Sequence, residues 1–184
     1  MEKTANAGNK TKSLVYMGFM VALIAICSWI SIPTTVPFTL QTFAIFVAVG
    51  LLGGKRGTLA VLVYLLLGAL GLPLFAGFQG GFGAILGPTG GYLIGFLLSA
   101  LVMWGITKAF GNSTLVLAIS MVVGLLACYI LGTIWFMVVY TSTSGAVGLA
   151  TVLGWCVIPF IIPDLIKIAV ALIVIKRLGK YVKI

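Results

Sequence analysis

The segment IIPDLIKIAV, residues 161–170, is almost entirely apolar, yet it places Asp164 and Lys167 three positions apart. A charged side chain inside a hydrocarbon layer costs at least ~2.5 kcal/mol, so both groups need a polar partner or a cavity. The segment therefore predicts a polar site inside an otherwise apolar helix. The rest of the chain indicates what kind of protein surrounds that site.

The composition is that of an integral membrane protein. Of the 184 residues, 62% are hydrophobic and 7% are charged, against roughly 25% charged in a typical soluble domain. Because so few charges cannot cover a water-facing surface, we expect one all-α membrane domain over residues 1–184. The net charge of +9 then belongs to loops that face an anionic lipid leaflet, and no nucleic-acid partner is expected.

Six apolar runs are candidates for transmembrane helices, which predicts a six-helix bundle in the lipid bilayer. A membrane span needs roughly 20 apolar residues, and the second, third and sixth runs are shorter than this. A cytoplasmic segment, residues 1–12, is expected before the first run. The runs cover about residues 14–32, 40–52, 58–72, 92–110, 115–140 and 163–175.

The basic residues occupy alternate connections between these runs. Apart from Lys167, every Lys and Arg precedes the first run, follows the second, ends the fourth or follows the sixth. This pattern matches the positive-inside rule and predicts a multi-pass protein of the cell membrane with both termini in the cytoplasm. Asp164 and Lys167 are then the only charges away from the cytoplasmic side. The connections without basic residues are 32–39, 73–91 and 141–162.

The predicted depth of Asp164 and Lys167 leaves two interpretations open. In a straight helix that reaches the interface at Lys176, they lie ~18 Å and ~13.5 Å from it. One interpretation is an ion pair that only fixes helix packing, with Asp164 at the N-terminal end of a helix that has Pro163 in its first turn. The other is a functional site, because transporters often build sites at interrupted helices.

Two of the connections without basic residues offer groups that could line a cavity beside this pair. SIPTTVPFTLQTF, residues 31–43, supplies Thr39 and Gln41 as neutral hydrogen-bonding groups. The glycine-rich segment 71–96 supplies Gln79 and Tyr92 in the same way. Ordinary turns and tight helix packing are the alternatives for these segments. Apolar walls are expected from Phe75, Phe78 and Phe82.

An acid, a base and neutral donors between apolar walls suit a small organic solute that has donor groups and an anionic end. The chain has no His, no paired cysteine spacing and no nucleotide-binding motif. Catalysis, metal binding and ATP hydrolysis by this chain alone are therefore not expected. The alternatives are a self-sufficient carrier or channel for a small solute, and an intramembrane enzyme acting on a lipid-like substrate.

Four strings resemble the signature segments of the BioY family, the biotin-binding S components of energy-coupling factor (ECF) transporters. They are VPFTLQTF, YLLLGALGLPLFAGFQGG, GPTGGYLIGF and IPDLIK. The resemblance implies a six-helix bundle that captures biotin from the outer side with high affinity and without a cofactor. It also implies work with a transmembrane T component and two cytosolic ATPase subunits.

The resemblance further implies which residues contact biotin. Asp164 would accept hydrogen bonds from the ureido N–H groups, and Tyr92 and Gln79 would complete the ring contacts. Lys167 would either pair with the biotin carboxylate or hold Asp164 ionised. The full set is Asp164, Lys167, Tyr92, Gln79, Gln41 and Thr39.

The first predicted helix carries small residues that the resemblance assigns to the T component. The family often has Ala-x-x-x-Ala at this place, and this chain has Gly18 and Ala22 at the same spacing. Glycine instead of the first alanine leaves the position of the docking face open.

Overall fold

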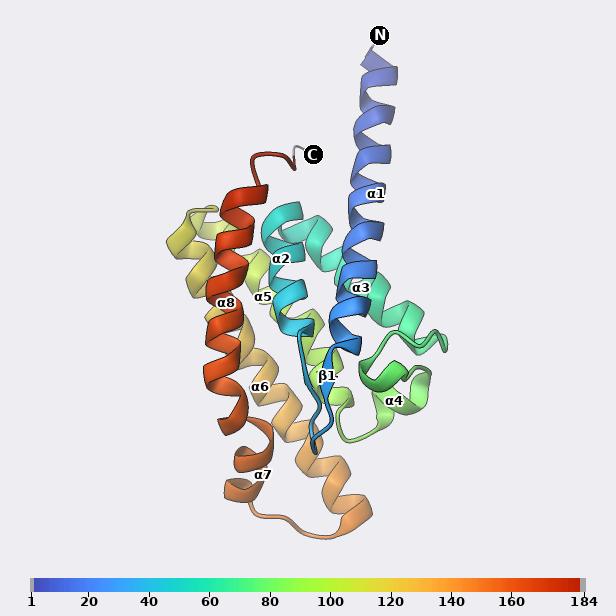
Figure 1. Cartoon of the computed structure of the whole chain (residues 1–184), viewed down its shortest axis with the longest axis vertical. Helices are drawn as coiled ribbons and strands as arrows, with labels where there is room; N and C mark the ends of the chain where they lie inside the picture. Colours follow the sequence, from blue (N-terminus) through green and yellow to red (C-terminus); the bar gives the residue numbers. More distant parts are fainter. Residues whose placement is uncertain (1, 183–184) are drawn as a thin grey trace.

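The computed structural model describes residues 2–182, with side chains from residue 10 onward. Within that range the protein is helical apart from one short hairpin (Figure 1). The elements are α1 (Glu2–Trp29), β1 (Ser31–Ile32), β2 (Phe38–Thr39), α2 (Gln41–Leu52), α3 (Gly54–Ala69), η1 (Ala76–Phe78), α4 (Phe82–Leu86), α5 (Gly90–Phe110), α6 (Thr114–Ser144), α7 (Leu149–Cys156) and α8 (Ile158–Leu178).

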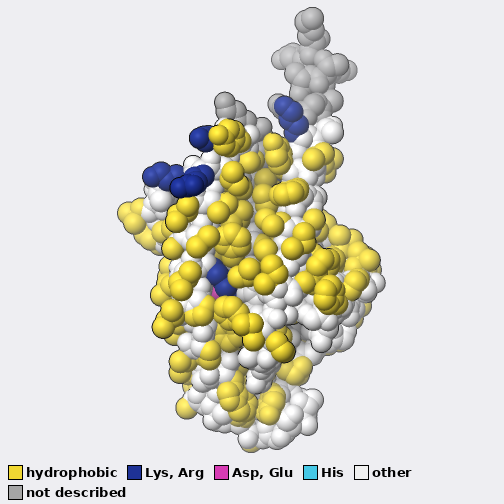
Figure 2. All heavy atoms as spheres, in the orientation of Figure 1, with side chains coloured by type: hydrophobic (Ala, Val, Ile, Leu, Met, Phe, Trp, Pro, Cys, Tyr) yellow, Lys and Arg dark blue, Asp and Glu magenta, His cyan; other side chains and the backbone are white. Residues whose placement is uncertain are grey.

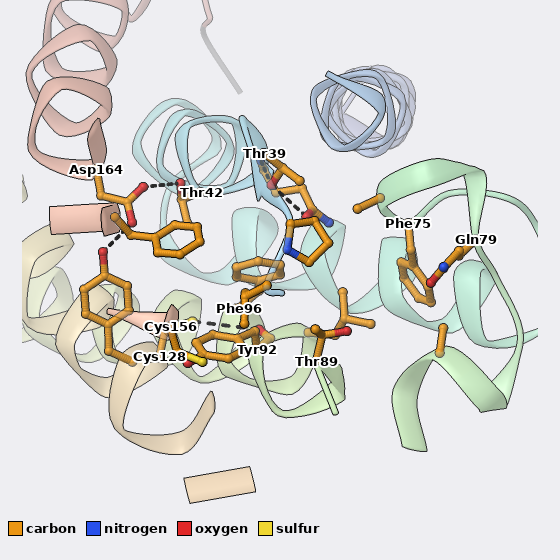
Figure 3. Close-up of a pocket in the computed structure, with 18 of the residues that line it drawn as sticks. Thr39, Thr42, Phe75, Gln79, Thr89, Tyr92, Phe96, Cys128, Cys156 and Asp164 are labelled. Atoms are coloured by element: carbon orange, nitrogen blue, oxygen red, sulfur yellow. Dashed lines mark hydrogen bonds between the residues drawn. The ribbon is translucent and has the colours of Figure 1, made fainter. Parts of the chain in front are cut away.

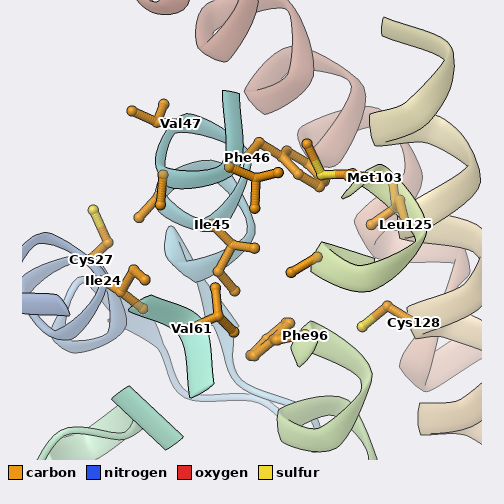
Figure 4. Close-up of a cluster of buried hydrophobic side chains, with 14 of the residues drawn as sticks. Ile24, Cys27, Ile45, Phe46, Val47, Val61, Phe96, Met103, Leu125 and Cys128 are labelled. Carbon is orange, nitrogen blue, oxygen red and sulfur yellow. The ribbon is translucent and has the colours of Figure 1, made fainter. Parts of the chain in front are cut away.

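Helix α2 lies in the centre of the bundle, because it is apolar on all sides and a helix of that kind is stable only when it is surrounded. Phe46 and Ile45 on α2 are each 1% exposed. They meet Ile24 of α1, Val61 of α3 and Met103 of α5 in a single hydrophobic cluster (Figure 4). This cluster fixes the positions of the helices that surround the site.

Glycines let α5 and α6 approach each other closely. A Cβ atom added at Gly95 would overlap Cys128, and one added at Gly132 would overlap the ring of Tyr92. A Cβ at Gly124 would likewise meet Ser99. Small residues are favoured at helix contacts in membranes because dispersion forces between closely packed backbones drive the association there. The abundance of glycine in the sequence thus has a packing role.

The exterior is apolar, as Figure 2 shows for one face, on which Lys and Arg side chains gather at the end where α1 begins and α8 ends. Helices α2 and α3, with 12 and 16 residues, are shorter than the ~20 that a full span needs. The count of six crossings therefore stays a prediction. Of the described residues, four segments are long and apolar enough to cross a membrane: Lys10–Trp29, Gly90–Phe110, Thr114–Ser144 and Leu149–Leu178.

The start of α8 differs from the prediction. The helix begins at Ile158, with Pro159 in its first turn and Pro163 inside it. Pro159 is tolerated there because the first N–H groups of a helix have no intrahelical acceptor. The prediction that Pro163 lies in the first turn, with Asp164 at the N-terminal end of the helix, is therefore wrong. Asp164 lies in the second turn, and its partners are side chains.

The first connection forms a hairpin instead of an open loop. Helix α1 ends at Trp29, and Ser31 and Ile32 pair in antiparallel fashion with Thr39 and Phe38. Pro33 follows the first strand and Pro37 precedes the second. Each proline disfavours helical backbone at the residue before it. The hairpin lies beside α2 and α8 and brings Thr39 to the interior of the bundle (Figure 1).

Candidate ligand-binding site

A cavity lies between the hairpin, the segment that follows α3, and helices α2, α5, α6 and α8 (Figure 3). It holds about 740 Å³ of empty space, counting the part open to solvent. All six residues that the sequence suggested line it: Thr39, Gln41, Gln79, Tyr92, Asp164 and Lys167.

Asp164 is held by three donors. Its Oδ1 atom accepts from Thr42 Oγ1 at 3.0 Å and from Lys167 Nζ at 2.8 Å, and its Oδ2 atom accepts from Tyr129 Oη at 2.5 Å. The side chain is 2% exposed. Hydrogen bonds to an ionised acceptor are stronger than neutral ones, and these three fix the orientation of the carboxylate toward the cavity.

Lys167 is enclosed by protein groups. Its Nζ atom donates to Asp164 Oδ1 and, at 2.6 Å, to the backbone carbonyl of Thr39. The ammonium also lies 4.2 Å from the centre of the Phe38 ring, close enough for attraction to the face of the ring. Lys167 therefore links α8 to the hairpin, and its charge is balanced inside the protein.

Gln41 belongs to a chain of hydrogen bonds behind the cavity wall. Its Oε1 accepts from Thr39 Oγ1 at 2.9 Å, and its Nε2 donates to Tyr64 Oη at 2.7 Å. Tyr64 Oη donates in turn to the carbonyl of Leu74 at 3.0 Å, and Ser28 Oγ on α1 donates to the same carbonyl. The network joins the hairpin, α2, α3 and α1.

Tyr92 and Gln79 occupy different parts of the cavity. Tyr92 is buried on α5, and its hydroxyl pairs with Thr133 Oγ1 of α6 at 3.1 Å. Gln79 is exposed, and among residues 10–182 its side-chain amide has no hydrogen-bond partner. Asp164 and Gln79 lie on opposite sides of the cavity in Figure 3. The cavity thus has a buried charged end and an exposed neutral end.

The aromatic walls differ in part from the prediction. Phe75 lines the cavity together with Phe96 and Phe160. Phe78 and Phe82, which were also expected to be walls, are 63% and 64% exposed. Phe78 has a positive φ of 58°, a conformation that is rare for such a residue, and its ring stacks on Trp29. The expectation is wrong for these two residues, because their side chains are exposed and do not line the cavity.

Sequence reasoning missed several polar groups of the site. Thr42 and Tyr129 hold Asp164, and Thr133 holds Tyr92. Cys128 and Cys156 also line the cavity. Polar side chains inside long apolar helices were the available signal, but no spacing in the sequence indicates which of them face Asp164.

Gly18 and Ala22, the residues suggested for contact with a partner protein, do not line the cavity. Both are exposed on α1. A Cβ atom at Gly18 would have no neighbour within 4 Å. This stretch of α1 is therefore open to a partner.

Comparison with known proteins agrees with the resemblance read from the four strings. The family model described as "BioY family" matches residues 1–184. The chain is 43% identical over 170 residues to the biotin transporter BioY of Thermotoga maritima, covering 92% of this chain and 96% of that protein. It is 40% identical to the probable biotin transporter BioY of Pyrococcus horikoshii, covering 92% and 97%.

A solved structure is similar as well. It is the crystal structure of the S-component for biotin from an ECF-type ABC transporter. The TM-score is 0.83 with 32% sequence identity, and the match covers 94% of this chain and 93% of that chain. Family model, relatives and architecture agree over nearly the whole length, and we conclude that the chain belongs to the BioY family.

Proposed function

We propose that this chain is the biotin-binding subunit of a vitamin-uptake transporter, and that it captures biotin without altering it chemically. The relatives named as biotin transporters and the similar S-component support this proposal. The observation that carries it is the buried pair Asp164–Lys167 at one end of a cavity with largely apolar walls. Burying such a pair costs desolvation free energy, so its presence indicates a role in binding a ligand or in fixing the structure.

The geometry supports one orientation of biotin. A carboxylate offers about four lone-pair sites, and Thr42, Tyr129 and Lys167 use three of those on Asp164. The remaining site, on Oδ2, would accept one ureido N–H of biotin. The aromatic walls would enclose the ring system and the aliphatic chain. The biotin carboxylate would then lie toward Gln79, at the exposed end.

This orientation assigns Lys167 to holding Asp164, the second of the two roles that the sequence left open. Both hydrogen bonds of Lys167 Nζ go to protein oxygens, those of Asp164 and Thr39. A direct bond to the biotin carboxylate would require one of them to break, or the third N–H to turn away from Phe38.

The proposal is tested by measuring equilibrium binding of biotin to the purified chain, followed by uptake of labelled biotin into vesicles. We expect tight binding by the chain alone, and uptake only when an ATP-hydrolysing module is added. Uptake at full rate without that module would indicate a self-sufficient carrier or channel. Recovery of chemically altered biotin would indicate an enzyme, and absence of binding would refute the proposal.

The partners follow from the same assignment. The chain carries no nucleotide-binding motif, and we propose that a transmembrane T component with two cytosolic ATPases supplies the energy. The open surface of α1 around Gly18 and Ala22 suits close approach by a helix of that T component, because small side chains allow two helix backbones to come close.

The arrangement of charges predicts the orientation in the cell membrane. We propose six crossings with both termini in the cytoplasm, because the basic residues favour that side. A thiol reagent that cannot cross membranes should label Thr143→Cys in intact cells, whereas Lys180→Cys should react only after the membrane is opened. Both positions are exposed, and the native cysteines are buried. The reverse labelling pattern would contradict the proposed orientation.

A further inference from the structure

A second hollow lies far from the ligand cavity, where the N-terminal part of α1 passes the junction of α2 and α3. It is a wide groove with about 1,500 Å³ of empty space, counting its open side. Lys10, Lys55 and Arg56 line it together with Leu14, Leu59 and Met17. The function proposed above uses none of these residues.

Among the side chains that the structure describes, the three cations of this groove have no counterion. Among residues 10–182 the only acidic residue is Asp164, which is paired with Lys167 inside the bundle. Lys55 and Arg56 also lie in the first turn of α3, which has no acidic residue and no side-chain cap. A helix N-terminus carries partial positive charge. The helix end and the cations therefore create a positive electrostatic potential that favours binding of an anion.

The wall of the groove is apolar. Leu14 and Leu59 are 64% and 41% exposed, and they lie on the same groove as the cations. A free inorganic anion would leave these leucines uncovered, whereas a phospholipid would place its headgroup at the cations and an acyl chain along the leucines. The groove lies at the end of the molecule where basic side chains gather, as Figure 2 shows, and this end is the expected level of lipid headgroups.

We propose that this groove binds an anionic glycerophospholipid, with the headgroup phosphate held by Lys55, Arg56 and Lys10 and an acyl chain seated against Leu14 and Leu59. Basic pockets between transmembrane helices are a known way of binding anionic headgroups. The proposal does not depend on which solute occupies the ligand cavity.

The test is native mass spectrometry of the purified full chain in mild detergent with phosphatidylglycerol or phosphatidylcholine of identical acyl chains. Wild type should retain phosphatidylglycerol in preference. The double variant Lys55→Gln/Arg56→Gln should lower that preference roughly 30-fold, at ~1 kcal/mol for each cation removed. The matched control Lys176→Gln/Arg177→Gln removes the same charge at the same end but outside the groove, and it should behave as wild type.

Two further arms make the result decisive. Lys10→Gln removes the third cation from a different helix, and it should weaken the preference even if the double variant does not fold. Inorganic phosphate at the lipid concentration should not displace the lipid. Equal binding of both lipids, an equal loss in both double variants, or displacement by phosphate would overturn the proposal. The proposal would also be overturned if the Lys55→Gln/Arg56→Gln protein kept wild-type lipid binding but no longer joined the ATPase module. That result would show that the groove serves a protein partner.

Discussion

Replacing Asp164 by asparagine should lower the affinity for biotin by roughly 10–100-fold, because a charge-assisted acceptor at the buried end of the cavity is lost. The change also leaves the Lys167 ammonium, 7% exposed, without its counterion. A hydrogen bond to a charged group contributes ~1.5–3 kcal/mol, and tenfold in affinity corresponds to ~1.4 kcal/mol. Isothermal titration calorimetry with the purified protein measures the loss.

Thr42→Val is the matched control for this experiment. It removes one neutral donor to the same carboxylate while keeping the charge and the shape of the site. A neutral hydrogen bond contributes ~0.5–1.5 kcal/mol, so the affinity should fall by about tenfold or less. Wild-type affinity in Asp164→Asn would show that the carboxylate does not contact biotin.

Replacing Lys167 by methionine should destabilise the protein by ~3–5 kcal/mol, because Asp164 would remain as an unpaired buried charge. The change also breaks the bond from α8 to the carbonyl of Thr39. Denaturant or thermal unfolding in detergent measures the loss. The double variant Asp164→Asn/Lys167→Met removes both charges, so it should regain most of the stability and still fail to bind biotin tightly.

The double variant separates the two interpretations of the ion pair. If the pair only fixed helix packing, the double variant would bind biotin like wild type. Carboxylate-amidated biotin then tests the role of Lys167. We expect amidation to change the affinity of wild type and Lys167→Met by the same factor. A large loss on amidation in wild type that disappears in Lys167→Met would show a direct bond between Lys167 and the biotin carboxylate.

Much of the architecture could be read from the sequence, because the class of the protein depends on composition and on long motif strings. The motif strings also identified six candidate ligand residues, and all six line one cavity. Their contact with biotin stays a prediction. Tyr129 could not be found in this way. It lies 35 positions from Asp164, and their meeting depends on how α6 and α8 cross in space.

The local backbone conformation was the second feature that could not be predicted from the sequence. Phe75 and Phe78 stand three positions apart in the same glycine-rich segment, yet one lines the cavity and the other stacks on Trp29 outside it. The difference follows from the conformation of a short turn that includes Gly77 at φ +66°. Glycine permits that turn, but its presence in the sequence does not specify the direction in which the next ring points.

The hydrogen-bond chain behind the cavity also has a mechanical consequence. From Ser28 on α1 it passes through the carbonyl of Leu74, then through three further side chains and Lys167 to the carboxylate of Asp164 on α8. The intermediate side chains are Tyr64, Gln41 and Thr39. Each link shares a residue with the next, so a displacement of α1 by a partner protein would be transmitted to Asp164, the proposed contact for the ligand. Docking of a partner protein on α1 and binding of the ligand at Asp164 would then be coupled through one chain of hydrogen bonds.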